Sequence, residues 1–191
     1  MTKNILLAGV GGQGTITAAK MLTMGLMEEG YDVKMSEIHG MSQRGGSVTS
    51  QVKYSREEVA SPVIEKGTAD IVVAFEEMEA LRSIDYLKAD GKLVVNLSRI
   101  PSMTVLTGAE EYPDDVMEEI KARVKDVTAI DATGLAEELG NPRAANVILL
   151  GALAQAMDLC DIDWDGIIRK SVKPAFVDLN IEAFSKGRSL V

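Results

Sequence analysis

The sequence has few residues of several types, and each shortage excludes a class of function. Cys160 is the one cysteine among 191 residues. The chain can therefore form no disulfide within itself, and it cannot supply the four thiolates that usually hold an iron–sulfur cluster. Aromatic residues make up only 4% of the chain, so Val, Ile, Leu, Ala and ten Met must fill its core. The length suits one domain, which we expect to span residues 1–191.

Long hydrophobic runs are also lacking. None reaches the roughly 18 to 20 residues that a membrane helix needs. The run at 5–10 is short and breaks into glycines, unlike a signal peptide. The 20 Lys and Arg against 29 Asp and Glu give a net charge of −9, which argues against nucleic acid or an anionic membrane as the main partner. We therefore expect a cytoplasmic protein that binds neither.

Short apolar segments alternate with helical patterns along the chain, which predicts a sheet between two layers of helices. The first strand, a glycine-rich turn, a helix to Glu29 and the second strand form a Rossmann-like β-α-β start. The alternation over 48–54 predicts a strand with one side facing water or an interface. The fold class is α/β: a three-layer α/β/α domain with a mainly parallel sheet and a helical C-terminal part. Strands are expected near 5–8, 33–37, 48–54, 70–75, 91–97 and 127–130, with a shorter one at 104–106.

The glycine-rich turn is the first candidate site. It matches the pattern G-x-G-x-x-G between a strand and a helix, with Glu37 at the end of the second strand. Glycines let a backbone approach a ligand closely, and the helix that follows offers free N–H groups to an anion, so a dinucleotide is one interpretation. The other is tight strand–helix packing without a nucleotide, and Gln13 could reach a partner by itself. The candidate residues are Gly9, Gly11, Gly12, Gln13 and Gly14.

A second motif follows the second strand. Arg44 stands before paired glycines that would let it project, and its guanidinium suits a carboxylate or phosphate. An interface role, in which Arg44 pairs with Glu37 or with an acid of a partner, is the alternative. His39 as a catalytic base is disfavoured, because no second catalytic group is evident. The candidate ligand- or interface-binding residues here are Glu37, His39, Gln43, Arg44, Gly45, Gly46 and Ser47, and none is expected to hold a metal or to be catalytic.

Three further signals have ordinary explanations. The acidic run at 161–166 imitates a calcium loop, but its twelfth position is Val172 rather than Glu, so it predicts a turn between helices. Cys160 is expected to be an inert, packed thiol. The acids Glu76, Glu77 and Glu79 are most simply surface charge that favours a helix N-terminus, although they could also lie at the carboxyl edge of the sheet, where ligands bind.

The two motifs together resemble a known family. Gly-Val-Gly-Gly-Gln-Gly at 9–14 and Arg-Gly-Gly at 44–46 are similar to the γ subunits of pyruvate and 2-oxoacid:ferredoxin oxidoreductases. The longer string at 37–48 most resembles the small (β) subunit of indolepyruvate ferredoxin oxidoreductase, and the stretch at 146–152 resembles the late Asn…Leu-Gly-Ala helix of that family. The resemblance covers nearly the whole chain.

The resemblance implies one subunit of a complex that oxidatively decarboxylates a 2-oxoacid to an acyl-CoA and reduces ferredoxin. It places thiamine diphosphate and [4Fe–4S] clusters on partner subunits, and it implies that this chain assists assembly and binds coenzyme A or the substrate. The isolated chain is then expected to be inactive. The alternatives are an NAD(P)-binding dehydrogenase domain, for which residues after 131 show no catalytic constellation, and a nucleotide-sensing regulatory module.

Overall fold

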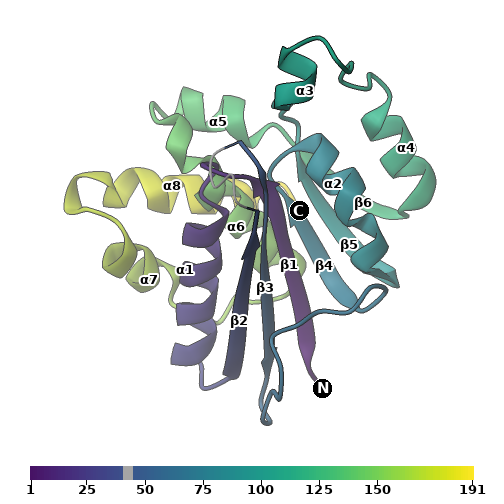
Figure 1. Ribbon diagram of the computed structural model, residues 1–191. Coiled ribbons are helices and arrows are strands. Elements are labelled where there is room, and N and C mark those ends of the chain that lie inside the picture. Colours follow the sequence, from purple (N-terminus) through teal and green to yellow (C-terminus); the bar gives the residue numbers. More distant parts are fainter. Residues whose placement is uncertain (41–44) are drawn as a thin grey trace.

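The protein is built on one six-stranded sheet. The computed structural model describes residues 1–40 and 45–191. Its strand order is β2-β3-β1-β4-β5-β6 (Figure 1), in which β1, β4, β5 and β6 pair in parallel while β3 is antiparallel to both of its neighbours. The strands are β1 Lys3–Val10, β2 Asp32–His39, β3 Ser47–Ser55, β4 Ala69–Ala74, β5 Leu87–Asn96 and β6 Asp126–Ile130.

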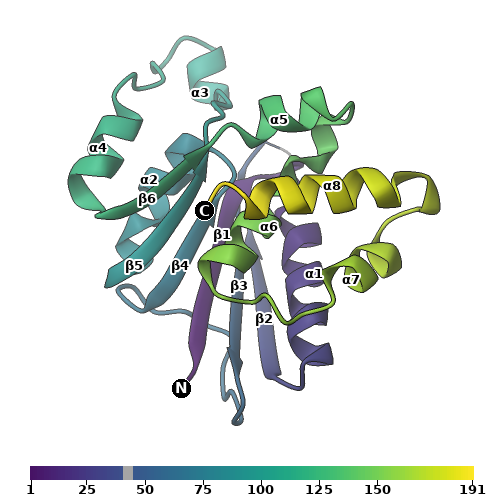
Figure 2. The same cartoon turned by 180° about the vertical axis from the view of Figure 1, so that it is seen from behind.

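Helices cover both faces of this sheet, which confirms the predicted three layers. Helices α1, α6, α7 and α8 lie on one face, and α2 and α4 lie on the other (Figures 1 and 2). The bounds of the helices are α1 Thr15–Glu28, α2 Glu77–Ser83, α3 Met103–Leu106, α4 Val116–Arg123, α5 Ala132–Glu138, α6 Ala145–Ala156, α7 Trp164–Ser171 and α8 Val177–Arg188, with 3-10 turns at Ile84–Tyr86, Pro142–Ala144 and Pro174–Phe176.

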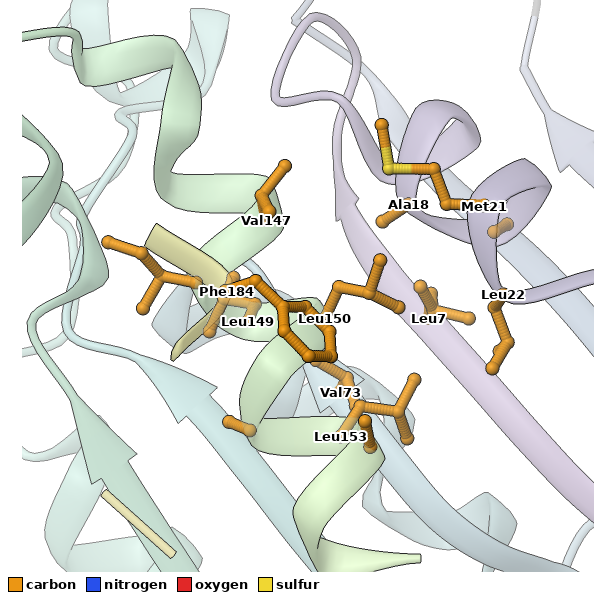
Figure 3. Close-up of a cluster of buried hydrophobic side chains, with 14 of the residues drawn as sticks. Leu7, Ala18, Met21, Leu22, Val73, Val147, Leu149, Leu150, Leu153 and Phe184 are labelled. Atoms are coloured by element: carbon orange, nitrogen blue, oxygen red, sulfur yellow. The ribbon is translucent and has the colours of Figure 1, made fainter. Parts of the chain in front are cut away.

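Alternate residues of the central strands enter two different cores. Leu7 of β1 and Val73 of β4 face α1 and α6, whose side chains close around them (Figure 3). Leu6 and Val72 face the other way, into the smaller core formed with α2 and α4. Strands buried on both faces read as continuous apolar runs, which is why the sequence predicts them well.

The Rossmann-like start differs from a simple β-α-β unit in one respect. Strand β2 runs in the same direction as β1, but β3 lies between them, with Val48 opposite both Gly9 of β1 and His39 of β2. The short connection at 40–46 makes β2 and β3 antiparallel neighbours, because a short link cannot cross over to a parallel strand. Strand β3 therefore enters the sheet between the two strands of the unit.

Three local predictions are corrected. The short strand expected at 104–106 is helix α3, which begins where Ser102 Oγ accepts the N–H of Val105. The side of β3 expected to face water or an interface is partly covered. Gln51 on that side is buried, and its Oε1 accepts the N–H of Ile64 at 2.6 Å. Cys160 is exposed rather than packed, because it lies in the turn beyond the end of α6.

One other local prediction holds in part. The acidic run at 161–166 contains the end of a turn between helices and the first turn of α7, where Asp163 Oδ1 accepts the N–H of Gly166 at 3.0 Å. Asn141 precedes the turn that Pro142 opens, and its side chain accepts the N–H of Arg143. Within the described parts of the chain, no helix combines the length and the apolar character needed to cross a bilayer.

Helices α6 and α8 cross at two glycines, one on each helix, and each glycine contacts the backbone of the opposite helix. A β-carbon on Gly151 of α6 would overlap the carbonyl oxygen of Phe184, and one on Gly187 of α8 would overlap that of Ile148. Helix α6 is buried along most of its length, so neither helix can move aside without disturbing the larger core.

We predict that Gly151→Ala or Gly187→Ala lowers the free energy of unfolding by about 2 kcal/mol, because overlap with the facing helix outweighs the gain of up to about 1 kcal/mol that alanine gives in a helix. Urea denaturation measures the change. Gly40→Ala is the control, since a β-carbon there meets nothing within 4 Å. Equal stability of all three variants would show that the crossing is not tightly packed.

Candidate functional site

The candidate site lies where β1, β4 and β5 end. Helix α1 follows β1 onto one face of the sheet and α2 follows β4 onto the other, so the chain turns in opposite directions after two adjacent parallel strands. Such a point leaves a crevice that ligands use in open α/β sheets. The glycine-rich turn lies on one side of it.

The glycines of the turn are needed for its backbone. Gly12 and Gly14 have φ values of +107° and +84°, which favour glycine. Gly9 has an ordinary backbone, but a β-carbon there would come within 2.8 Å of Thr15 Cγ2 and 3.0 Å of Phe75 Cβ. The turn therefore packs closely against the end of β4.

The side chain of Gln13 spans the crevice. Its Oε1 accepts the N–H of Val10 at 2.7 Å, and its Nε2 donates to the carbonyl oxygen of Phe75 at 2.8 Å. Gln13 thus joins the ends of β1 and β4, and its contact with a ligand or partner stays a prediction.

Asn96, at the end of β5, completes this junction and was not among the predicted site residues. Its Nδ2 donates to the same Phe75 oxygen at 3.1 Å and to Thr133 Oγ1 at 3.1 Å, while its Oδ1 accepts the N–H of Ala132 at 2.9 Å. The signal that could have found it is a polar residue directly after the buried run at 93–95.

The structure brings the two sequence motifs together. The N–H of Gly11 donates to the carbonyl oxygen of Gly46 at 2.9 Å, and the N–H of Gly45 donates to that of Gly11 at 3.4 Å. Ser47 then opens β3 opposite Val10. Gln43 and Arg44 lie outside the described residues, so their predicted roles remain predictions.

Glu37 and His39 lie beside the glycine turn on the exposed end of β2. They line a cavity of about 410 Å³ together with Gly11, Gly12 and Gly14. These five candidates, drawn from both motifs, thus share one surface. Whether they bind a ligand or a partner stays a prediction.

A second cavity, of about 540 Å³, lies on the other side of the turn. Gln13, Phe75 and Asn96 line it, as do Arg143 and Asn146 from the segment that opens α6. Asn146 Nδ2 donates to the carbonyl oxygen of Gly14 at 3.4 Å. None of the described side chains caps α1, so its first N–H groups, together with the exposed guanidinium of Arg143, could face an anion here.

The three acids at the end of β4 are not surface charge, contrary to the simpler prediction. Glu76, Glu77 and Glu79 are only 1%, 5% and 2% exposed. They lie at the carboxyl edge of the sheet, as the second interpretation allowed, but their oxygens are occupied by the protein itself. Helix α2 begins at this edge, and its N-terminus favours negative charge.

Each of these carboxylates has definite partners. Glu76 Oε2 caps α2 by accepting the N–H of Glu79 at 2.9 Å, and its Oε1 accepts the hydroxyl of Tyr112 at 2.5 Å. Glu79 accepts the hydroxyl of Ser47 at 2.6 Å and the guanidinium of Arg82 at 2.6 Å. A buried charge is tolerated only when it is paired and hydrogen-bonded in this way.

Two groups beside the carboxylates have shifted pKa values. Burial raises the pKa of Tyr112, and its hydrogen bond to Glu76 raises it further. The hydrogen bond to Glu77 raises the pKa of Arg99, whose Nε lies 2.9 Å from Glu77 Oε2. Both groups therefore stay protonated near neutrality and act as hydrogen-bond donors.

The described polar groups at this edge are either paired within the protein or exposed. Across residues 1–40 and 45–191, no group of three or more His, Cys, Asp and Glu side chains is arranged to hold a metal ion. The buried carboxylates are held by internal donors, whereas the uncapped end of α1 and Arg143 face open cavities. Such groups can bind an anion or a protein surface.

Residues 4–190 match the sequence model described as pyruvate ferredoxin/flavodoxin oxidoreductase. The chain belongs to this family. It is 42% identical to "Indolepyruvate oxidoreductase subunit IorB" of Pyrococcus horikoshii over 96% of this chain and 93% of that protein. It is 31% identical to "2-oxoglutarate synthase subunit KorC" of Methanothermobacter marburgensis over 100% of this chain and 97% of that protein.

The oxidoreductase family also accounts for the fold. The crystal structure of pyruvate oxidoreductase subunit PORC from Thermotoga maritima superposes with a TM-score of 0.75 at 22% identity, covering 99% of this chain and 96% of that one. The resemblance read from the two motifs is confirmed, and the relatives are subunits of 2-oxoacid oxidoreductases. Neither these relatives nor the strand inserted between β1 and β2 supports a dinucleotide-binding dehydrogenase.

We predict that Gln13→Glu destabilises this oxidoreductase subunit by about 2 kcal/mol at pH 7, because a carboxylate oxygen would face the carbonyl of Phe75 in place of a donor. The protonated carboxyl can donate to that carbonyl, so its folded-state pKa lies above its unfolded value of about 4.3. The penalty is therefore small below about pH 4 and grows as the pH rises through the folded-state pKa.

Urea denaturation at pH 4 and pH 7 measures the effect. Gln155→Glu, at the end of α6, is the matched control and should change stability little at either pH. A penalty independent of pH would count against the contact between Gln13 and Phe75.

Proposed function

We propose that this chain is the γ-type subunit of a 2-oxoacid:ferredoxin oxidoreductase and corresponds to the small subunit of the indolepyruvate branch. The complex would convert a 2-oxoacid, coenzyme A and oxidised ferredoxin to an acyl-CoA, carbon dioxide and reduced ferredoxin. The whole chain, 1–191, would act as one γ-type domain. The observation that carries the proposal is family membership along almost the full length of both this chain and its relatives.

The metal and thiamine chemistry would reside on partner subunits. One cysteine cannot hold a four-thiolate cluster, so the donor set of this chain does not fit such a group. A partner subunit would hold thiamine diphosphate, which would supply the decarboxylation chemistry there. This chain would complete the complex and contact the substrate or coenzyme A.

The glycine turn and the 37–47 segment would form the contacting surface. Backbone pairing between Gly11 and residues 45–46 supports this assignment, because it holds the second motif directly beside the first. The N–H groups at the start of α1 and the guanidinium of Arg143 fit a phosphate of coenzyme A across the cavity that Asn146 also lines. Arg44 would add either a contact to an anion or an ion pair with an acid of a partner.

The proposal is tested by co-expressing the chain with the thiamine- and cluster-carrying subunit encoded with it. The two should co-purify, and the complex should reduce ferredoxin with an aryl-pyruvate and coenzyme A, whereas the isolated chain should be inactive. The isolated chain is also titrated with NAD(H), ADP and coenzyme A. Tight NAD binding that Glu37→Ala abolishes would overturn the proposal in favour of a dehydrogenase domain.

We predict that Arg44→Ala weakens complex assembly or raises the KM for coenzyme A by about tenfold, which corresponds to one charge-assisted contact. The fold of the isolated chain should be unchanged by circular dichroism. Arg169→Ala, at an exposed position on α7, is the matched control. Wild-type assembly and kinetics in the Arg44 variant would remove Arg44 from the contacting surface.

A further inference from the structure

The segment at 97–115 connects β5 to α4 and carries α3 (Figure 1). Figure 1 shows α3 standing beyond the carboxyl edge of the sheet, at the same end of the molecule as the start of α1. No residue of α3 is buried. This segment therefore adds little to either core, and its conformation must be maintained by other means.

Polar contacts hold the base of the 97–115 segment closed. Near its start, Arg99 pairs with Glu77 and also donates to the carbonyl oxygen of Asp114 at 3.1 Å, so one side chain joins the two ends of the segment to α2. Tyr112 donates to Glu76, whose Oε1 also accepts the N–H of Ile100 at 3.2 Å. These bonds to buried carboxylates pre-organise the segment, and a pre-organised segment loses less conformational entropy when it binds.

The outer face of this segment is apolar. Met103 and Leu106, one helical turn apart on α3, are 71% and 66% exposed. Val105 lies between them in sequence and lines a cavity of about 380 Å³ between the segment and α2. Two large apolar side chains thus point away from the protein on a segment that is tied in place, which is the arrangement of an interface anchor.

The charged residues that follow α3 within this segment have one sign. Glu110, Glu111, Asp114 and Asp115 are exposed, and the sequence from 100 to 115 contains no Lys, Arg or His. Arg99 is already paired with Glu77. Acidic residues repel an acidic surface and attract a basic one. These four acids therefore favour a partner whose surface around Met103 and Leu106 is basic.

We propose that the 97–115 segment is a docking surface for a partner subunit of the same complex, whose complementary surface is an apolar patch ringed by Lys and Arg. This proposal rests on the proposed function. The net charge of −9 makes a second copy of this chain a poorer match than a basic partner. The docking surface stands at the edge where the glycine turn and residues 37–40 and 45–47 lie, so one partner could cover both.

The experiment measures the affinity of the purified chain for the partner subunit that co-purifies with it. Met103→Ser/Leu106→Ser should weaken binding at least about tenfold, because two anchors are lost. Glu110→Lys/Glu111→Lys should weaken binding to a similar degree at low salt and less at 0.5 M NaCl, where the charges are screened. Circular dichroism and thermal unfolding of the variants should match wild type, since these side chains lie outside the cores.

Matched controls lie at the opposite edge of the sheet. Met27→Ser/Val63→Ser replaces two apolar side chains that are 60% and 55% exposed, and Glu57→Lys/Glu58→Lys reverses an adjacent pair of exposed acids. Neither control should alter affinity. The comparison thereby separates loss of a particular surface from a general change in hydrophobicity or charge.

The outcomes are distinguishable. If the wild-type chain does not bind the thiamine- and cluster-carrying subunit, the proposed function fails and the docking surface fails with it. If the wild type binds and the 97–115 variants bind equally well, the docking surface alone is overturned. Self-association of the isolated chain that the Met103/Leu106 variant abolishes would overturn the assignment to a partner and indicate a second copy instead.

Discussion

The carbonyl group of Phe75 is the point on which the carboxyl edge of the sheet depends. It accepts hydrogen bonds from Gln13 after β1 and from Asn96 at the end of β5, while the N–H of Phe75 donates to Ala8 of β1. Three strand ends are thus joined at the backbone of one residue, through two neutral amide side chains and one backbone hydrogen bond. A crevice at this position commonly admits a ligand, but here two side chains cross it. The glycine turn packs closely against Phe75 and pairs its backbone with residues 45–46.

The buried acids Glu76 and Glu79 connect this edge of the sheet, through α2, to two surface segments. Glu79 accepts a hydrogen bond from Ser47 of the second motif, and Glu76 accepts one from Tyr112, which closes the 97–115 segment. Glu76 also caps the helix that carries Glu79. Two surface segments that are distant in sequence are therefore oriented by the first turn of one helix. Removing a donor from this network would leave a buried carboxylate with fewer hydrogen bonds, so the network favours one arrangement of the edge.

The sequence predicts the elements whose structure is determined by burial, and it fails for those whose structure is determined by polar contacts. Continuous apolar runs such as 5–8 and 70–75 identify the central strands, because burial on both faces leaves a clear pattern. The segment at 104–106 has β-branched residues yet forms α3, since Ser102 supplies a cap and no strand lies alongside to pair with it. The sequence alone indicates surface charge for the acids at 76–79, because their hydrogen-bond donors, among them Arg99 and Tyr112, are distant in sequence. The insertion of β3 between β1 and β2 depends in the same way on long-range pairing that no local pattern encodes.

Some polar groups at the carboxyl edge of the sheet are hydrogen-bonded within the protein and others are not, and this difference indicates what the edge contributes. An active site needs polar groups held ready for a reacting atom, and here the carboxylates and amides of the edge mostly bind other parts of the protein. Among the described groups that face outward are the first N–H groups of α1, the guanidinium of Arg143, the side chains of Glu37 and His39 and the apolar side chains of α3. They differ in chemistry but share a position at one end of the sheet. An edge whose buried carboxylates and amides are internally paired, while these other groups remain exposed, is suited to recognition of a ligand or a protein surface.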